Sequence, residues 1–373
     1  ESPASVKEAD EMIGSRPTPM PRRRFIRISA AVPGLALLPL PRRPGGVSAA
    51  EAGRQLRIWR GAALGADAMM QLHHPDPIAA DRLIAQCLTE VGRLERIFSL
   101  YRPDSAISQL NRAGRLDDPP IELVELLSQS AQFSRVTGGA FDVTVQPLWD
   151  LYAAHFSAPG ADPFGPPPAK IATALRQVGA AGVEVDPSRI RFTKPGMRIT
   201  LNGIAQGTIT DRVVALLRAE GIDRSLVDMG EIRAIGPRPD GTPWRVGLRD
   251  PAAPEHTAGA ITIANEAVAT SGGYGTPLDP AGQFNHIFNP ATGATSTAYR
   301  SVSVVAATAT MADALATGFC LMRLEACQGV SDRLGVRTHF VLQDGTLLTQ
   351  TPRSNARGQQ RTRTGWLPRG ARG

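Results

Sequence analysis

The sequence contains little cysteine and no apolar run of the length that crosses a membrane. Its 373 residues include three cysteines, Cys87, Cys320 and Cys327, an odd number without a CxxC pair. Neither a disulfide framework nor a cysteine metal site is therefore favoured, and Cys320, inside an apolar run, is expected to be a small buried residue. No segment approaches the ~20 uninterrupted apolar residues of a membrane-spanning helix, so we expect that the chain is not itself transmembrane.

Acidic residues are absent from two arginine-rich segments that account for the positive net charge. Residues 21–43 and 353–373 each contain six arginines and no acid, while residues 1–20 carry a net charge of −2. Removing these contributions from the total of +7 leaves −3 for residues 44–352. The body is slightly acidic, so the basic isoelectric point gives no reason to expect a nucleic-acid partner.

The first basic segment has the layout of an export signal. The run RRRFIR at residues 22–27 is followed by an apolar stretch over 28–40 and by small residues at 47–50. Paired arginines, a modest apolar region and a small-residue end are typical of a twin-arginine signal, which predicts a periplasmic protein. The alternative is a basic N-terminal arm. We therefore expect an N-terminal extension with its signal over residues 1–49.

The remaining sequence predicts one domain over residues 50–350 and a basic, disordered tail over 351–373. Hydrophobic residues make up 42% of the chain, enough for a sizeable core. Helices are expected at 76–97, 119–136, 210–219 and 311–322. Strands are expected at 55–71 with a break at Gly65, at 189–192, 198–201, 225–227, 232–235, 244–248, 260–263, 267–270, 286–288 and 301–306, and in a hairpin of 339–342 with 346–349. Helices and strands intermix without a βαβ rhythm, which predicts the α+β class.

Two side chains in the segment TMADALATG, residues 310–318, have the spacing of a metal site. On a helix, Asp313 and Thr317 lie four residues apart and project from one face. A carboxylate above a hydroxyl offers two hard oxygen ligands, and Mg²⁺ takes one or two carboxylates and completes its shell with phosphates and water. The alternative is structural, because Thr310 and Asp313 also resemble the start of a capped helix.

Glycines precede the helix expected at 210–219, in the segment LNGIAQG at residues 201–207. Glycine lets backbone groups approach a phosphate, and helix N-termini favour anions. A plain strand–turn–helix is the alternative. The segment is not a Walker A loop, because it lacks the Gly-Lys-Ser/Thr ending.

Three further segments offer groups for catalysis or ring stacking. The segment ATSGGY at 269–274 carries hydroxyls, and His286 is a candidate base for a hydroxyl nucleophile because its pKa lies near working pH. Tyr101 is a candidate for stacking on a flat ring. In each case the alternative is a structural role, as a histidine near a strand end or as an aromatic residue packed beside a turn.

The order of these segments resembles the ApbE family of FAD:protein FMN transferases. The motifs are FSxYRPDSxISxLN, GGAFDVT, GIAxG before a helix, ATSGGY, HIFNPxTG and ADALATG, and the resemblance covers roughly residues 57–350. It implies a single α+β domain around one FAD. It also implies Mg²⁺-dependent transfer of FMN to a Thr or Ser hydroxyl of an acceptor flavoprotein, with release of AMP. The twin-arginine signal and the wording LNGIAQG are similar to the NosX-type branch, which is associated with nitrous oxide respiration. The acceptor flavoprotein is expected to be a membrane-bound electron-transfer subunit.

The same resemblance implies roles for individual residues. His286 is the expected base, and Tyr101 is expected to pack near the flavin or the adenine. The metal ligands are expected to be the Gly203 carbonyl and the side chains of Asp313 and Thr317. Contacts to FAD are expected from Ala140, Phe141, Asp142, Gln206 and the backbone of Ile287.

The sequence departs from the family pattern at three positions. Gln206 stands where the family usually has lysine, and Thr200 and Asn289 stand where it usually has aspartate. A neutral amide gives up an electrostatic contact with the ligand but still forms hydrogen bonds. These differences keep open the alternative of a flavin-binding chaperone or reservoir that modifies nothing. A flavin-dependent oxidoreductase is less favoured, because no GxGxxG follows a strand.

Overall fold

An eight-stranded antiparallel sheet forms the centre of the computed structural model, which describes residues 55–251 and 253–353. The strand order is β1-β2-β6-β7-β10-β11-β12-β13, and every neighbouring pair is antiparallel. Its strands are β1 (Gln55–Ala63), β2 (Ala66–His74), β6 (Ser225–Asp228), β7 (Ile232–Ile235), β10 (Ala267–Ser271), β11 (Ser301–Ala306), β12 (Arg337–Val341) and β13 (Leu347–Gln350). The expected signal segment and most of the basic tail lie outside the described residues.

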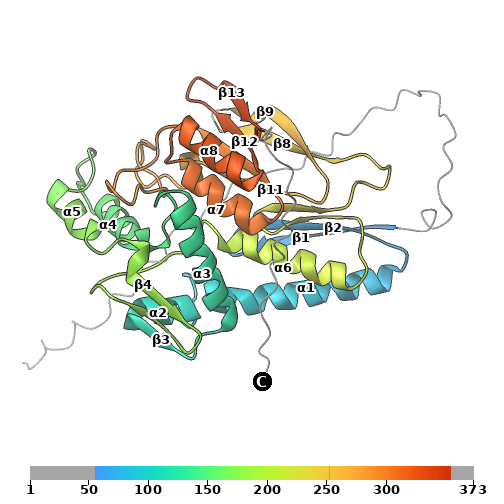
Figure 1. The fold of residues 1–373 in the computed structure, drawn as a ribbon, viewed down its shortest axis with the longest axis horizontal. Helices are drawn as coiled ribbons and strands as arrows, with labels where there is room; N and C mark the ends of the chain where they lie inside the picture. The colour runs from blue at the N-terminus through green and yellow to red at the C-terminus, as the bar shows by residue number, and fades with distance from the viewer. Residues whose placement is uncertain (1–54, 252, 354–373) are drawn as a thin grey trace, which may run out of the picture.

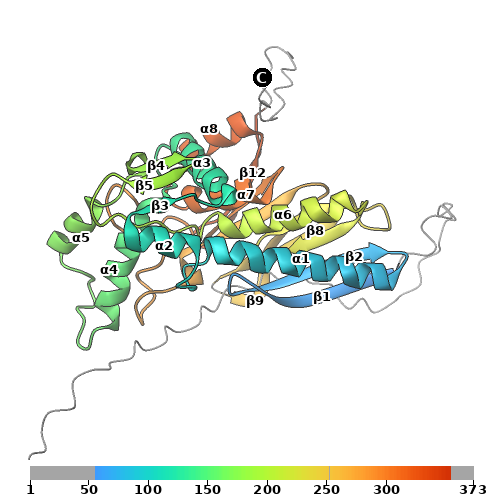
Figure 2. The same ribbon diagram turned by 90° about the horizontal axis from the view of Figure 1, so that it is seen from below.

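Helices cover one face of this sheet and a two-stranded ribbon covers the other. The helices are α1 (Pro77–Phe98), α6 (Ala205–Ala219), α7 (Ala309–Phe319) and α8 (Leu324–Leu334), and the ribbon is β8 (Trp244–Asp250) paired with β9 (Ala253–Ile263). Figure 2 shows α1 and α6 side by side beneath the sheet. Because both faces are covered, all six residues of β11 are buried: Val304 packs with the α7 and α8 side chains and Val305 with the ribbon.

Within the described residues, a second and smaller layer lies beside the sheet (Figure 1). It contains a three-stranded sheet in the order β3-β5-β4 and four helices. These elements are α2 (Ala106–Ala113), β3 (Arg115–Asp117), α3 (Ile121–Val136), α4 (Gln146–Ser157), α5 (Pro168–Leu175), β4 (Val183–Asp186) and β5 (Arg189–Phe192). An apolar cluster around Tyr152 and Phe288 joins α4 and α5 to the loop after β10.

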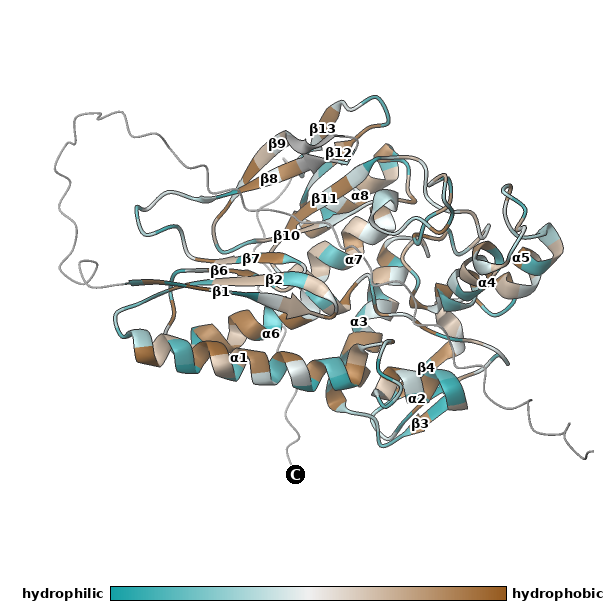
Figure 3. Ribbon diagram, turned by 180° about the vertical axis from the view of Figure 1, so that it is seen from behind, coloured by the Kyte–Doolittle hydropathy of each residue, from teal (hydrophilic) through white to brown (hydrophobic). Residues whose placement is uncertain are grey.

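Local sequence signals explain the first elements. The strand expected at 55–71 is the β1–β2 hairpin, and its turn has positive φ at Leu64 and Gly65, as a two-residue hairpin turn requires. The α1 helix begins after Asp76, whose carboxylate accepts hydrogen bonds from the backbone N–H groups of Ile78 and Ala79. Its buried side chains recur every three or four residues, which produces the alternating apolar and polar bands along α1 in Figure 3.

Several sequence predictions of local structure were wrong. Residues 198–201 are not a strand, and 286–288 form no strand beyond an isolated bridge between Phe288 and Thr295. The α6 helix starts at Ala205 instead of Thr210, and its cap position, Ile204, makes no side-chain hydrogen bond. Helices α2, α4, α5 and α8 were not predicted. Within the described residues, no helix has the length and apolarity that crossing a membrane demands.

Candidate active site

A cavity of about 550 Å³ opens between the β1–β2 hairpin, the start of α6 and the middle of α7. Its size lies within the range of about 300–1,000 Å³ that small-molecule sites occupy. The structure brings together nine of the ten predicted site residues in its wall, from four separate segments of the chain. These are Ala140, Phe141, Asp142, Gly203, Gln206, His286, Ile287, Asp313 and Thr317.

The α7 helix presents Asp313 and Thr317 to the cavity from one face. Asp313 is only 2% exposed, and its Oδ2 accepts a hydrogen bond of 3.0 Å from the backbone N–H of Gly207. The Thr317 hydroxyl lies 3.2 Å from the hydroxyl of Ser271. The helix is capped by Thr308, whose side chain accepts from the N–H of Met311. Asp313 therefore lies beyond the cap, so the capped-helix alternative for Thr310 and Asp313 was wrong, while the metal role of Asp313 stays a prediction.

The start of α6 meets α7 with no room for a side chain at two of its glycines. A β-carbon on Gly203 would lie 2.8 Å from Oγ1 of Thr317, and one on Gly207 would overlap the carbonyl of Ala309. The cap position of α6, Ile204, makes no side-chain hydrogen bond, and Gly203 and Gln206 at this end of the helix line the cavity. A helix N-terminus favours an anionic group, and the Asp313 carboxylate is one such group, at the N–H of Gly207.

Gln206 lies in the first turn of α6 with its amide buried against the turn between β6 and β7. The Gly230 residue of that turn has φ +102°, and a β-carbon there would lie 2.5 Å from Nε2 of Gln206. Only glycine satisfies both the backbone conformation and this close approach. Among the described residues, Nε2 of Gln206 has no hydrogen-bond partner. A buried donor in the wall of a cavity is a position that a bound ligand would satisfy.

The segment Ala140–Asp142 supports the wall of the cavity through packing and hydrogen bonds. Phe141 is 3% exposed and packs edge-on against Phe133, with ring centroids 6.4 Å apart. The Asp142 carboxylate accepts from the N–H and hydroxyl of Thr144 and from the N–H of Ala180, at 2.6–2.9 Å. Asp142 therefore holds the backbone of this segment in place, and its predicted contact with FAD stays a prediction.

His286 and Ile287 enter the cavity wall from an irregular loop. The N–H of Ile287 donates to Oδ1 of Asn285 at 3.1 Å, and its carbonyl accepts from the N–H of Ser296 at 2.8 Å. A carbonyl oxygen has a second lone pair, so this oxygen is the backbone atom of Ile287 with capacity for a ligand. Asn289 does not line the cavity. Its side chain accepts from the N–H groups of Ala291 and Thr292, a turn that either Asn or Asp forms.

Tyr101 is the predicted site residue that the structure does not bring into this wall. It lies in the turn between α1 and α2, where its N–H donates to the Ser99 hydroxyl at 3.3 Å. Its side chain is 53% exposed, so any contact with a bound ring would cover a surface that is open in this structure. The stacking role of Tyr101 stays a prediction.

Three acids that the sequence analysis missed also line the cavity, namely Asp67, Asp228 and Glu231. Asp228 ends β6, and Glu231 precedes β7, on either side of Gly230. Burial raises the pKa of Asp228 to about 7, although the hydrogen bond from the N–H of Gly230 partly opposes this increase. Burial also raises the pKa of Glu231 well above its usual range, and the charges of Asp313 and Asp228 add to the increase. A sequence signal was present, because acids at the ends of two short strands that are almost entirely buried are unusual.

The cavity wall is acidic, and this shapes what it can bind. Its lining includes five carboxyl groups, those of Asp67, Asp142, Asp228, Glu231 and Asp313, and one guanidinium, that of Arg60. Burial raises the pKa of Asp313 to about 7; the Gly207 N–H lowers it and the charge of Asp211 raises it. A cation beside Asp313 would reverse this effect, because an opposite charge favours the ionised form. An anionic ligand would therefore bind here best together with a cation.

The donor atoms in the cavity wall supply only part of a coordination shell. They therefore fit Mg²⁺, which takes further ligands from a substrate, better than a metal bound by protein side chains alone. Among the described residues, no group of three or more His, Cys, Asp or Glu side chains is placed to hold a metal. Asp313 supplies a carboxylate and Thr317 a hydroxyl, with the backbone of Gly203 beside them. Mg²⁺ is usually held by one or two carboxylates, with substrate phosphates and waters as its other ligands. The site therefore fits an ion that arrives with a phosphate-bearing substrate.

The fold and this cavity place the chain among α+β proteins with a deep binding site between two crossing helices and a sheet. The chain belongs to the ApbE family, whose sequence pattern matches residues 64–340. This confirms the resemblance drawn from the ordered motifs and the predicted fold class.

Named relatives and solved structures agree with the family. The FAD:protein FMN transferase of Treponema pallidum is 31% identical over 283 residues, covering 70% of this chain and 77% of the relative. That of Klebsiella pneumoniae is 29% identical over 281 residues, covering 72% and 79%. The ApbE protein of Thermotoga maritima matches with a TM-score of 0.70 and 28% identity, covering 79% and 97%. The flavin transferase ApbE of Vibrio cholerae has the same fold, with a TM-score of 0.70, 24% identity and coverage of 81% and 98%.

Proposed function

We propose that this chain is an FAD:protein FMN transferase that moves the FMN half of FAD onto a Thr or Ser hydroxyl of an acceptor flavoprotein and releases AMP. The reaction class is that of its named relatives. One observation carries the assignment to this site. Asp313 and Thr317 lie one helical turn apart, face the cavity, and meet the glycine loop that begins α6. This places two oxygen ligands beside a helix N-terminus that favours phosphate.

The acidic wall supports a requirement for Mg²⁺. The FAD diphosphate is anionic, and five carboxyl groups line the cavity against one arginine. Asp313, Thr317 and the backbone of Gly203 would hold the ion. When bound, Mg²⁺ would act as a Lewis acid that stabilises charge on the phosphoryl oxygens and on the departing AMP.

His286 is the proposed base for the acceptor hydroxyl. A new bond forms between the hydroxyl oxygen and the FMN-side phosphorus, the bond from that phosphorus to the bridging oxygen breaks, and the hydroxyl proton passes to His286. AMP leaves with the bridging oxygen. The flavin ring undergoes no redox change. Gln206 would donate a hydrogen bond to FAD through the amide that lacks a partner among the described residues.

The test is a transfer assay with the purified chain, FAD, Mg²⁺ and a periplasmic flavoprotein domain as acceptor. Wild-type protein should raise the acceptor mass by one FMN and release AMP. Asp313→Ala should abolish both without unfolding the protein, while Asp332→Ala, which removes an acid outside the cavity wall, should transfer normally. Transfer by Asp313→Ala at the normal rate would make the metal assignment wrong.

A flavin reservoir that binds FAD without transferring FMN is the second candidate. Two neutral side chains in the cavity wall, Gln206 and Thr200, favour it. The family usually has charged residues at these positions, which would interact more strongly with the substrate. The same assay separates the two functions: a reservoir retains FAD in the presence of Mg²⁺ and leaves the acceptor mass unchanged.

We further propose that the protein is exported to the periplasm by its twin-arginine signal and serves a membrane-bound electron-transfer subunit. The arginines at 22–27 and the small residues at 47–50 support export. The wording LNGIAQG at 201–207 supports the NosX-type branch and a role in nitrous oxide respiration. Replacing Arg22 and Arg23 by lysine should retain the protein in the cytoplasm, as measured by cell fractionation. Unchanged periplasmic delivery of that variant would exclude the signal.

A further inference from the structure

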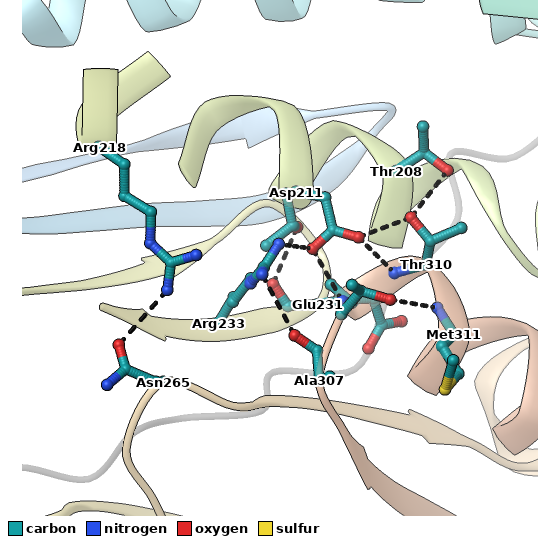
Figure 4. A network of polar contacts seen from close by, with 12 residues as sticks. Thr208, Asp211, Arg218, Glu231, Arg233, Asn265, Ala307, Thr310 and Met311 are labelled. Carbon is teal, nitrogen blue, oxygen red and sulfur yellow. Dashed lines mark hydrogen bonds and ion pairs between the residues drawn. The ribbon is translucent and has the colours of Figure 1, made fainter. Parts of the chain in front are cut away.

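A carboxylate from α6 occupies the N-terminus of α7, the helix that carries both proposed side-chain ligands of the cation. Oδ1 of Asp211 accepts from the N–H of Ala309 at 2.8 Å. Its Oδ2 accepts from the N–H of Thr310 at 2.9 Å and from the Thr310 hydroxyl at 2.7 Å. Figure 4 shows the contacts between Asp211 and Thr310. Asp211 thus satisfies two backbone donors that helix geometry leaves unpaired.

Arg233 holds the Asp211 carboxylate from the side of the sheet. Its NH1 forms an ion pair with Oδ1 of Asp211, and its NH2 donates to the carbonyl of Ala307 at 3.2 Å, just before α7 (Figure 4). The two side chains are only 11% and 18% exposed. One carboxylate and one guanidinium therefore join α6, β7 and the start of α7, in surroundings where such hydrogen bonds are strong.

The α6 and α7 helices are in close contact where they cross. Gly207 lies one turn before Asp211 on α6, and a β-carbon there would overlap the Ala309 carbonyl. The N–H of Gly207 also binds Asp313, at 3.0 Å. A shift of α7 relative to α6 would therefore move Asp313 and Thr317 away from Gly203. Close packing transmits such a shift instead of absorbing it.

The α7 helix has a cap from its own segment besides this carboxylate. Thr308 accepts from the N–H of Met311, while Asp211 accepts from the N–H groups of Ala309 and Thr310. Because Asp211 belongs to α6, its carboxylate fixes the start of α7 to a second helix, which a cap from within the same segment does not do.

We propose that Asp211, held by Arg233, is a positioning residue of the cation site, which sets α7 against α6 so that Asp313 and Thr317 face Gly203 at the spacing a divalent cation needs. The inference rests on the proposed function, since it concerns the ion that accompanies FAD. Outer groups that orient metal ligands typically change metal affinity or activity by about 10–100-fold when removed.

The test measures cation binding directly. Mn²⁺ is titrated into the full chain with FAD, and the free ion is followed by electron paramagnetic resonance. Asp211→Asn and Arg233→Met should weaken Mn²⁺ binding by about 10–100-fold, and Arg233→Lys, which keeps the charge, should recover part of the loss. The Mg²⁺ concentration for half-maximal AMP release should rise in parallel, with a smaller change in kcat at saturating Mg²⁺.

The matched control is Glu90→Gln. Glu90 on α1 also accepts from arginines, Arg93 and Arg212, and Arg212 lies on α6 next to Asp211. It contacts the outer side of α6, away from the cavity wall, so its variant should bind Mn²⁺ as wild type does. Should Asp211→Asn fail to fold, the two Arg233 variants carry the test.

Mn²⁺ affinities within twofold of wild type in folded Asp211 or Arg233 variants would overturn the proposal and leave these residues a scaffolding role. If wild-type protein binds Mn²⁺ with FAD but transfers no FMN, the proposed function fails while the Asp211 comparison is still decided by the binding data.

Discussion

Gly203 and Thr317 approach each other so closely that a β-carbon on residue 203 would lie 2.8 Å from the threonine Oγ1. The loop before α6 and the middle of α7 therefore meet at a distance that only glycine permits. We predict that Gly203→Ala pushes Thr317 out of position and raises the Mg²⁺ concentration for half-maximal AMP release by about 10–100-fold. The measurement is an Mg²⁺ titration of the transfer assay.

The control for this change is Gly92→Ala in α1. A β-carbon at Gly92 would meet no atom within 4 Å, and alanine favours a helix interior over glycine by about 0.8–1 kcal/mol. That variant should be slightly more stable and have an unchanged Mg²⁺ requirement. An unchanged requirement in Gly203→Ala as well would show that the close approach has no part in cation binding.

The sequence predicted those parts of the fold whose signals are local. The α1 helix follows from its apolar spacing and from the cap at Asp76, and the β1–β2 hairpin from the break at Gly65. The start of α6 escaped prediction because Gly207 reads as a helix breaker. Only the crossing with α7, a contact over a hundred residues apart in sequence, explains why glycine is needed in that first turn.

The same distinction between local and long-range signals applies to the candidate site. Asp313 and Thr317 were found because their spacing of four residues is a property of one helix. Glu231 and Asp211 were missed because their roles depend on which strand or helix lies opposite, and a single sequence does not specify that. The strand expected at 286–288 is an irregular loop, because Asn285 and Ser296 take up the backbone hydrogen bonds that a neighbouring strand would otherwise receive.

The free energy of unfolding of the protein should depend on pH because of Asp228. Burial raises the pKa of this carboxyl from 3.8 to about 7 in the folded chain, so the folded state binds more protons than the unfolded state between these values. Stability from this group is present in full below pH 4 and is lost as the pH rises to about 7. In Asp228→Asn the amide oxygen still accepts from the N–H of Gly230, and the charge never forms.

We therefore predict that the melting temperature of Asp228→Asn, relative to wild type, increases between pH 4.5 and pH 7.5. Each kcal/mol should correspond to no more than roughly 2–4 °C, the range for domains of about 150–250 residues, because the shift decreases with chain length. Thermal unfolding at several pH values measures the difference. A difference that stays constant, or moves the other way, would contradict the raised pKa.

Tyr101 provides a test of whether FAD extends beyond the cavity wall. Its ring is 53% exposed, so truncation removes little packing and should leave the melting temperature unchanged. If the ring stacks on the flavin or the adenine, Tyr101→Ala should weaken FAD binding roughly tenfold, since such stacking contributes about 1–3 kcal/mol. Phe164, which is 87% exposed and does not line the cavity, is the matched aromatic control. Equal FAD affinities in Tyr101→Ala, Phe164→Ala and wild type would remove Tyr101 from the site.

A variant of His286 should distinguish FAD binding from FMN transfer. It lies in the cavity wall beside Ile287, and the proposed mechanism uses it only to take the acceptor proton. His286→Gln should therefore bind FAD and Mg²⁺ as wild type does, while the rate at which the acceptor gains FMN falls by about 10²–10⁴-fold, the usual contribution of a general base. His155→Gln is the control, because His155 lies outside the cavity wall and its Nε2 contacts the carbonyl of Asp162.

Two measurements make this prediction decisive: acceptor mass against time, and FAD affinity by flavin fluorescence. A fall in affinity that matches the fall in rate would show that His286 holds the substrate instead of moving a proton. A rate that recovers in His286→Gln as the pH is raised would support proton removal, because hydroxide and water then replace the missing base.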